Sequence, residues 1–345
     1  MGFSLGILAV LAAGFGGCEN PWMKEAVAPL YKNKDGGENN SGGGSGVPVP
    51  TLHSIGEVTA YLAAATVIPV PLAVALNLSG SEWLDLLGAI NGAGKTVQLD
   101  LSACTPSGSS GCLYTSGGDV IFDPDSSDSD SGRIAAKGLI TSLVLPATAE
   151  IIPAGAYANP TFKHFAFTSI KGENVQEIRD YAFFGLTFLT SADFPAAEEI
   201  GLSVFHDCNN LAEVSLLKAE TIAASAFRNC ASLTSMDLPE ATLINGSFYG
   251  CTLLESLNLP KVENIGTNSF RDCAALTTLN LGKATAPVLG TSVFRDTGTG
   301  TLTIHVPAGA VGNYMGAWSV SASTVPSGNQ GVYGLSHKQI EITDL

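Results

Sequence analysis

The sequence predicts an α/β-type repeat solenoid, in which short coils stack so that each adds one strand to a parallel ladder. Three observations predict this fold class. A phenylalanine recurs at nearly constant intervals from Phe183 to Phe294. A cysteine stands shortly after four of these phenylalanines, always at the same offset, and a leucine series from Leu189 to Leu276 keeps the same period. Independent columns that share one period indicate a structural unit of about 22 residues.

Stacking explains why whole columns of residues repeat. One coil cannot bury its apolar face alone, whereas coils stacked at about 4.8 Å turn each column into a continuous ladder. We expect the leucines to fill the strand side of the core and the phenylalanines to fill the return side. The cysteines suit small buried positions with free thiols. The columns are Phe183, Phe205, Phe227, Phe248, Phe270 and Phe294; Leu189, Leu211, Leu233, Leu254 and Leu276; Phe194, Leu216, Leu238, Leu259 and Leu281; Ile200, Ile222, Ile244 and Ile265; and Cys208, Cys230, Cys251 and Cys273.

The N-terminal residues resemble a bacterial lipoprotein signal. Residues 1–17 carry no charge, and the apolar run Ile7–Ala13 has the length of a signal-peptide core rather than of a membrane-spanning helix. Small residues directly precede Cys18, which the resemblance assigns as the lipidated residue. The alternative is an ordinary signal peptide with an incidental cysteine. Residues 18–50 are rich in Gly, Ser and Asn and are expected to form a flexible tether.

The rest of the chain divides into an N-terminal capping module, the repeats and a C-terminal cap. Residues 51–133 read as a small α/β module that caps the first coil, with helices over Glu57–Ala65 and Ser81–Asn91 and strands over Pro71–Leu78 and Thr96–Leu101. The repeats occupy residues 134–307, and residues 308–345 form the C-terminal cap. A folded solenoid needs such caps at both ends.

The repeats resemble a known family. Leu254–Pro260 (LESLNLP) followed by Ile265–Cys273 (IGTNSFRDC) is similar to the BspA-like, or Treponema-type, leucine-rich repeat, over about residues 139–307. The resemblance implies a right-handed leucine-rich-repeat solenoid with short return segments. It also implies a monomeric, lipid-anchored protein of the cell envelope, on the outer membrane and facing outward. Its implied partner is a protein of the host matrix or of another cell's surface.

Charge and motifs exclude several other functions. The formal charge is −15, with 16 Lys and Arg against 31 Asp and Glu, so nucleic acid is repelled. The glycines in Ala89–Thr96 follow a helix and precede a strand, the reverse of a phosphate-binding loop. No nucleophile elbow or zinc-protease motif occurs, so we expect no enzyme, and we expect no cofactor or metal site. An enzyme within the module is the least favoured reading.

An acidic loop and a pair of cysteines each allow two interpretations from the sequence. The acidic loop with Asp123, Asp125, Asp128 and Asp130 lacks the calcium-loop arrangement, and we expect it to be solvated, with weak calcium binding as the alternative. Cys104 and Cys112 bracket a polar Gly/Ser loop, which favours a disulfide in an oxidising compartment.

The outward residues of the repeated strands form the candidate binding face. They are small and polar, without aromatic residues, which favours a protein partner over a sugar; the charge favours a basic one. The alternatives are a merely solvated sheet face and a structural envelope protein with no specific partner. The candidate residues are Asp193, Glu213, Ser215, Asp237, Asn258 and Asn280.

Overall fold

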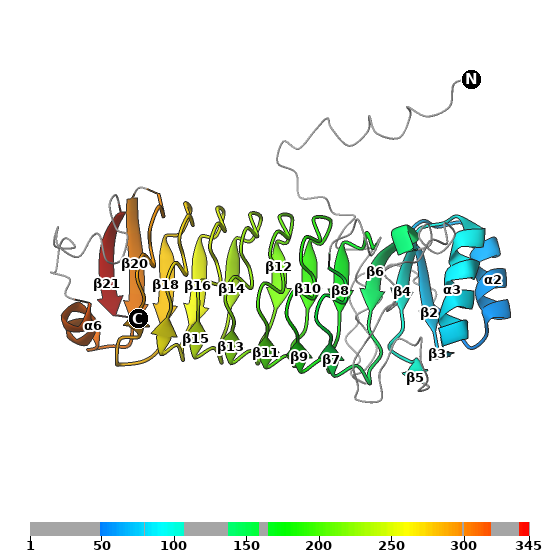
Figure 1. Ribbon diagram of the computed structural model, residues 1–345, viewed down its shortest axis with the longest axis horizontal. Helices are drawn as coiled ribbons and strands as arrows, with labels where there is room; N and C mark the ends of the chain where they lie inside the picture. Colours follow the sequence, from blue (N-terminus) through cyan, green and yellow to red (C-terminus); the bar gives the residue numbers. More distant parts are fainter. Residues whose placement is uncertain are drawn as a thin grey trace, which may run out of the picture. The chain divides into compact units, whose positions relative to one another are not determined.

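The computed structural model describes residues 49–78, 80–106, 137–158, 165–298, 300–318 and 338–344. The chain from Val49 to Leu345 forms one compact unit, and Met1–Pro48 falls outside it. The described residues are coils stacked side by side, each with a strand on one side and a shorter strand on the return side (Figure 1). This arrangement confirms the predicted repeat solenoid.

All strand pairs among the described residues are parallel, and most of them fall into two ladder sheets and one return sheet. The first ladder sheet has the order β1-β2-β4-β6-β8-β10-β12, and the second has the order β14-β16-β18-β20-β21. Their strands are β1 (Thr51–Leu52), β2 (Val70–Val74), β4 (Val97–Asp100), β6 (Ile140–Val144), β8 (Ser169–Lys171), β10 (Ser191–Asp193), β12 (Glu213–Ser215), β14 (Ser235–Asp237), β16 (Ser256–Leu259), β18 (Thr278–Leu281), β20 (Gly300–Val306) and β21 (Lys338–Asp344).

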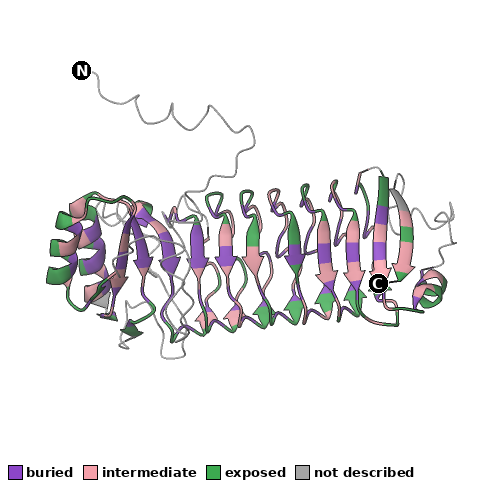
Figure 2. Ribbon diagram, turned by 180° about the vertical axis from the view of Figure 1, so that it is seen from behind, coloured by how far each residue is buried: buried purple, intermediate pink, exposed green. Residues whose placement is uncertain are grey.

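The return sheet runs without interruption along the same coils, in the order β7-β9-β11-β13-β15-β17-β19. Each of its strands is very short, with an exposed or partly exposed first residue and, in most coils, a buried second residue; Figure 2 shows this row of short strands coloured by burial. The strands are β7 (Ile151–Ile152), β9 (Glu177–Ile178), β11 (Glu199–Ile200), β13 (Thr221–Ile222), β15 (Leu243–Ile244), β17 (Asn264–Ile265) and β19 (Val288–Leu289).

The phenylalanine column forms a continuous stack inside the solenoid. All six rings from Phe183 to Phe294 are fully buried, and neighbouring ring centroids lie 5.1 to 6.0 Å apart. Tyr157 extends the stack by one coil, because its ring lies parallel to that of Phe183 at 5.3 Å. Sequence analysis missed Tyr157, since it precedes Phe183 by more than the usual repeat length and its residue type differs.

The cysteine column links each coil to the one before it. Each thiol is buried and donates a hydrogen bond to a phenylalanine carbonyl in the preceding coil, at 3.0 to 3.2 Å. The pairs are Cys208 with Phe183, Cys230 with Phe205, Cys251 with Phe227, and Cys273 with Phe248. The free-thiol interpretation of these cysteines is therefore confirmed.

The N-terminal helices replace return segments in the first coils. Helix α2 (Ile55–Ala64) connects β1 to β2, and helix α3 (Gly80–Ala93) precedes β4. Ser54 caps α2 by accepting from the Glu57 amide, while the Glu57 carboxylate accepts from the amide of His53, the residue before the cap. Lys95 donates to the Leu62 and Ala65 carbonyls at the other end of this helix. Both predicted helices are confirmed.

The strands of this region join the repeats in one sheet. β2 pairs with β4, and β4 pairs with β6, so the ladder starts well before the repeat period becomes visible in the sequence. The segment predicted as a single strand over Pro71–Leu78 is divided into β2 and β3 (Asn77–Leu78), and β3 pairs with β5 (Thr105–Pro106) in a separate small sheet. The predicted boundary at residue 133 lies outside the described residues.

The C-terminal helix and the residue after it are hydrogen-bonded to the last coils. Helix α6 (Val311–Ala317) ends beside Trp318, whose indole donates to the Pro287 carbonyl at 3.0 Å. The Tyr314 hydroxyl donates to the Lys283 carbonyl at 2.7 Å. Within the described parts of the chain, no helix combines the length and apolar composition that crossing a bilayer requires.

Candidate binding surfaces

The outward column of the first ladder sheet contains charged residues at neighbouring positions. Asp193 lies in register with Ser215 on one side and with Lys171 on the other. The Lys171 ammonium lies 3.5 Å from the Asp193 carboxylate and 3.1 Å from that of Glu173. Glu213 belongs to the adjacent outward column, in register with Ser191, and is exposed. The structure thus brings together Asp193, Ser215 and Glu213.

The second ladder sheet carries the remaining predicted residues. Asp237, Asn258 and Asn280 are in register, and the Asn258 amide donates to the Asp237 carboxylate at 2.7 Å. His305 continues the column and contacts the Thr343 hydroxyl at 2.9 Å. Because β12 and β14 belong to different sheets, the predicted face consists of two shorter columns rather than one. We call these two columns, with Glu213, the ladder face.

Sequence reasoning missed two members of these columns, Lys171 and His305. Lys171 pairs in register with Val144, and His305 pairs with Asn280. Both pairs are farther apart along the chain than the usual repeat length, so the period did not reveal these positions. Their strands still align in register with those of the neighbouring coils. Only the alternation of apolar residues around them, in SIK and TIHV, could have identified these positions.

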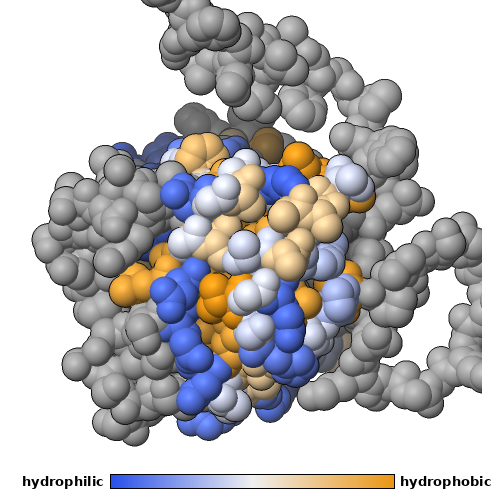
Figure 3. Space-filling model, turned by 90° about the vertical axis from the view of Figure 1, so that its right-hand side faces the viewer, coloured by the Kyte–Doolittle hydropathy of each residue, from blue (hydrophilic) through white to orange (hydrophobic). Residues whose placement is uncertain are grey.

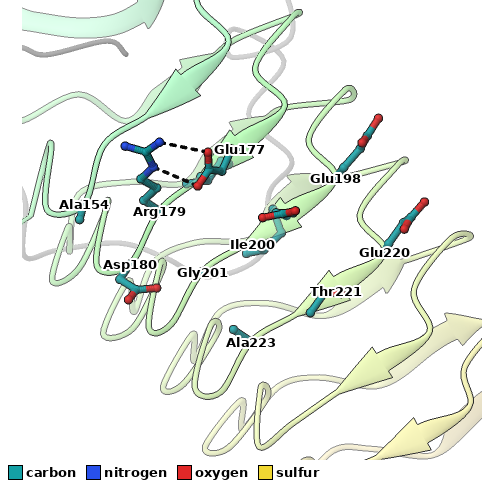
Figure 4. Close-up of a pocket in the computed structure, with 12 residues that line it drawn as sticks. Ala154, Glu177, Arg179, Asp180, Glu198, Ile200, Gly201, Glu220, Thr221 and Ala223 are labelled. Atoms are coloured by element: carbon teal, nitrogen blue, oxygen red, sulfur yellow. Dashed lines mark hydrogen bonds and ion pairs between the residues drawn. The ribbon is translucent and has the colours of Figure 1, made fainter. Parts of the chain in front are cut away.

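A second surface lies on the return sheet, where an open groove of about 650 Å³ crosses β9, β11 and β13 (Figure 4). The floor of the groove contains Gly201 and Ala223. A Cβ atom at Gly201 would lie 2.7 Å from the Asp180 amide nitrogen, so only glycine allows the two coils to approach this closely here. The Asp180 carboxylate accepts from the Leu202 amide at 2.7 Å across the same junction.

The rim of the groove is acidic. Glu198, Glu199 and Glu220 line the groove and are exposed, and Figure 4 shows Glu198 and Glu220 extending from neighbouring coils. Arg179 also lines the groove, but its guanidinium is bound in a two-point contact to Glu177, at 2.9 and 3.3 Å. Among the described residues, the three rim glutamates form no ion pair or side-chain hydrogen bond. Sequence analysis did not predict this groove.

A third hollow lies at the end of the solenoid that carries α2 and α3. It measures about 260 Å³ and lies beside Val67 and Ile68, which are 66% and 63% exposed. Figure 3 faces this end and shows hydrophobic surface next to hydrophilic residues. No charged residue is among those that line the hollow. It is lined by Tyr61, Ala64, Ala65, Thr66, Val67, Val70 and Pro71.

The remaining predicted sites are largely outside the described residues. Cys18, Cys112 and the acidic loop of residues 123–132 all fall there. Cys104 is described and buried: its Sγ lies 3.3 Å from the Val74 carbonyl oxygen and 3.5 Å from the Leu76 amide nitrogen. The disulfide with Cys112 stays a prediction. In the part of the chain that is described, no three His, Cys, Asp or Glu side chains gather to hold a metal ion.

The stacked coils, their period and their leucine and phenylalanine columns define a leucine-rich-repeat solenoid. This class is typically a non-enzymatic scaffold and usually mediates protein–protein interaction through its extended surfaces. The family model of the BspA type leucine rich repeat region matches residues 135–245 and 242–316, with six copies, which is more than half of the 345 residues. The chain therefore belongs to this family, as the sequence resemblance indicated.

Solved structures of other leucine-rich-repeat proteins are similar to this chain. One from Treponema pallidum has 24% identity over 45% of this chain and 76% of its own, with a TM-score of 0.40. One from Eubacterium ventriosum also has 24% identity and a TM-score of 0.40, and the match covers 45% of this chain and 42% of its own. One from Bacteroides ovatus has 16% identity over 62% of this chain and 64% of its own, with a TM-score of 0.30. No curated protein matches.

Proposed function

We propose that this chain is a lipid-anchored protein of the bacterial cell surface that binds a protein of a host or neighbouring cell through the ladder face. The observation that carries the proposal is the contrast between the buried and the outward columns of the same strands. The buried columns are filled by stacking, whereas the outward columns keep polar and charged side chains in register from coil to coil.

Charge indicates the kind of partner. Asp193 and Asp237 lie in the two columns of the ladder face, and the whole chain carries a formal charge of −15. Such a surface attracts a basic protein and accelerates its encounter, with an effect that decreases as salt increases. Binding should therefore weaken when the salt concentration is raised.

The test is capture of host-matrix proteins by the full chain and by the variant Asp193→Lys/Asp237→Lys. We expect the variant to bind the captured partner at least about fivefold more weakly, because two attractive contacts become repulsive. The matched control is Glu150→Lys/Glu255→Lys, which changes the charge equally at exposed positions outside the two columns. Equal binding by wild type and the ladder variant would place recognition elsewhere. Absence of any salt-sensitive partner would favour a structural envelope protein.

The anchoring part of the proposal concerns Cys18. Its support is the uncharged apolar start of the sequence and the two glycines before the cysteine. The variant Cys18→Ser should move the protein from the membrane fraction to the soluble fraction of the cells. If the serine variant stays in the membrane fraction to the same extent, lipidation at this residue is wrong.

A further inference from the structure

Tyr181 has a backbone conformation that is unusual for its residue type. Its φ is 59°, in the left-handed region, where a bulky side chain is disfavoured. The same position in the following coils also has positive φ, but holds only small or polar residues. These are Ser203, Ser225, Gly246, Asn268 and Ser292.

Packing buries only part of the tyrosine at this position. The residue is 44% exposed, and its ring pairs edge-on with that of Phe184, with the ring centroids 6.1 Å apart. A partly exposed ring recovers little of the free energy that the backbone conformation costs. Strained backbone that stability does not require is found preferentially at functional sites, which makes Tyr181 a candidate for ligand contact.

The tyrosine is the neighbour in sequence of a residue that lines the groove on the return sheet and is not itself a lining residue. It directly follows Asp180, which lines the groove, and its amide donates to the Leu202 carbonyl at 2.8 Å. Leu202 follows Gly201, the glycine of the groove floor. Both coils that meet at Tyr181 therefore continue into the groove lining.

The shape and charge of the groove limit what can occupy it. Its lining runs over four coils, from Ala154 to Ala223, which corresponds to roughly 14 Å at the spacing of parallel strands. An extended chain covers that length with about four residues. Glu198 and Glu199 line it from one coil and Glu220 from the next, while Arg179 is already bound to Glu177.

We propose that the groove and Tyr181 form a docking site for an extended arginine-rich segment of a protein partner. The rim glutamates match guanidinium groups in charge and geometry, and the Tyr181 ring offers a face on which a guanidinium can stack. The site shares no residue with the ladder face, so it gives the protein a second, chemically distinct surface. Its failure would leave the proposed function of the ladder face intact.

The test uses fluorescently labelled hexa-arginine and the full chain, measured by fluorescence anisotropy at low salt. The groove variant Glu199→Gln/Glu220→Gln should weaken binding about threefold to tenfold, as expected for two exposed charge contacts. The matched control Glu255→Gln/Glu341→Gln removes the same charge at exposed positions outside the groove and should change binding less than twofold. Equal losses in both variants would mean unspecific attraction to a negative protein and would overturn the proposal.

The tyrosine is tested by Tyr181→Asn, which places there the residue that Asn268 supplies in a later coil. We expect roughly tenfold weaker binding of hexa-arginine, typical of a lost aromatic anchor, and an unfolding midpoint that is not lowered. Asparagine tolerates the left-handed region, so loss of the ring should not reduce stability. A lowered midpoint with unchanged binding would show that Tyr181 is structural and would overturn its role in the site.

Discussion

The ladder face and the groove on the return sheet share the coils of β8, β10 and β12 but differ in how their charges are satisfied. On the ladder face, Asp237 accepts from Asn258, and Asp193 lies beside Lys171. On the return side, Glu199 and Glu220 form no ion pair or side-chain hydrogen bond with other described residues. Stacking fixes the inward residues of every coil, so coils can differ freely only on their surfaces. This difference in charge pairing shows that surface residues on the two sides of the solenoid can differ while the core stays the same.

The largest expected effect tests whether a phenylalanine in the middle of the solenoid contributes more stability than one near its end. Phe227 stacks between Phe205 and Phe248 at 5.3 and 5.2 Å, whereas Phe294 stacks only on Phe270 among the described rings, at 5.7 Å. Phe227→Ala should lower the free energy of unfolding by about 3–5 kcal/mol through lost burial and a cavity. Phe294→Ala should cost less. Chemical denaturation measures both, and equally small losses would contradict the stacked core.

The second effect is a loss of stability at high pH that results from the buried cysteines. Burial raises the pKa of the Cys208 and Cys251 thiols to about 12, from 9.0. The unfolded chain therefore releases these protons at lower pH than the folded one, so stability is fully present below pH 9 and decreases between about pH 9 and 12. Each thiol contributes about 1.4 kcal/mol per pH unit in that window.

The measurement is denaturant unfolding at pH 8, 9, 10 and 11. Cys208→Ala/Cys251→Ala should be less stable at pH 8, because two hydrogen-bonded thiols are lost, yet should lose stability less steeply above pH 9. If the variant and wild type lose stability in parallel, the thiols are not the groups that titrate.

The third effect concerns the floor of the groove. Gly201→Ala should destabilise the protein by about 1–3 kcal/mol, because the added methyl group would collide with the backbone at Asp180. Gly88→Ala is the matched control within α3, where nothing lies within 4 Å of the new methyl group. There the helix should gain about 0.5–1 kcal/mol. Similar midpoints for both variants would show that the coils at Gly201 can separate without cost.

The smallest expected effect is the stability change of the ladder variant Asp193→Lys/Asp237→Lys. Each substitution removes one contact at the surface, that of Asp193 with Lys171 or that of Asp237 with Asn258, and should lower the free energy of unfolding by about 0.5–1 kcal/mol. Thermal unfolding of this variant beside wild type measures the change. A loss of several kcal/mol would mean that the ladder face stabilises the fold, and the contrast between core and surface would then fail on this side.

The repeat period of the sequence predicts those parts of the fold whose residues recur in every coil. It does not predict features that depend on how closely two coils approach each other. Every coil from Phe183 onward repeats its columns, so the core could be predicted residue by residue. The first coils use α2 and α3 as connections, and so β2 and β4 carry no such period although they belong to the same sheet. The groove depends on Gly201 and on very short strands, which are too short to show a pattern.

The interruption between β12 and β14 divides the amide hydrogens of the ladder into two groups. The return sheet remains paired across the same two coils, with Thr221 opposite Leu243 and Ile222 opposite Ile244. On the ladder side, β12 and β14 end separate sheets. Hydrogen exchange should therefore divide the ladder into two blocks of protection that meet at this point, because local opening follows contiguous paired units. The return sheet continues across this junction and keeps the two coils hydrogen-bonded to each other there.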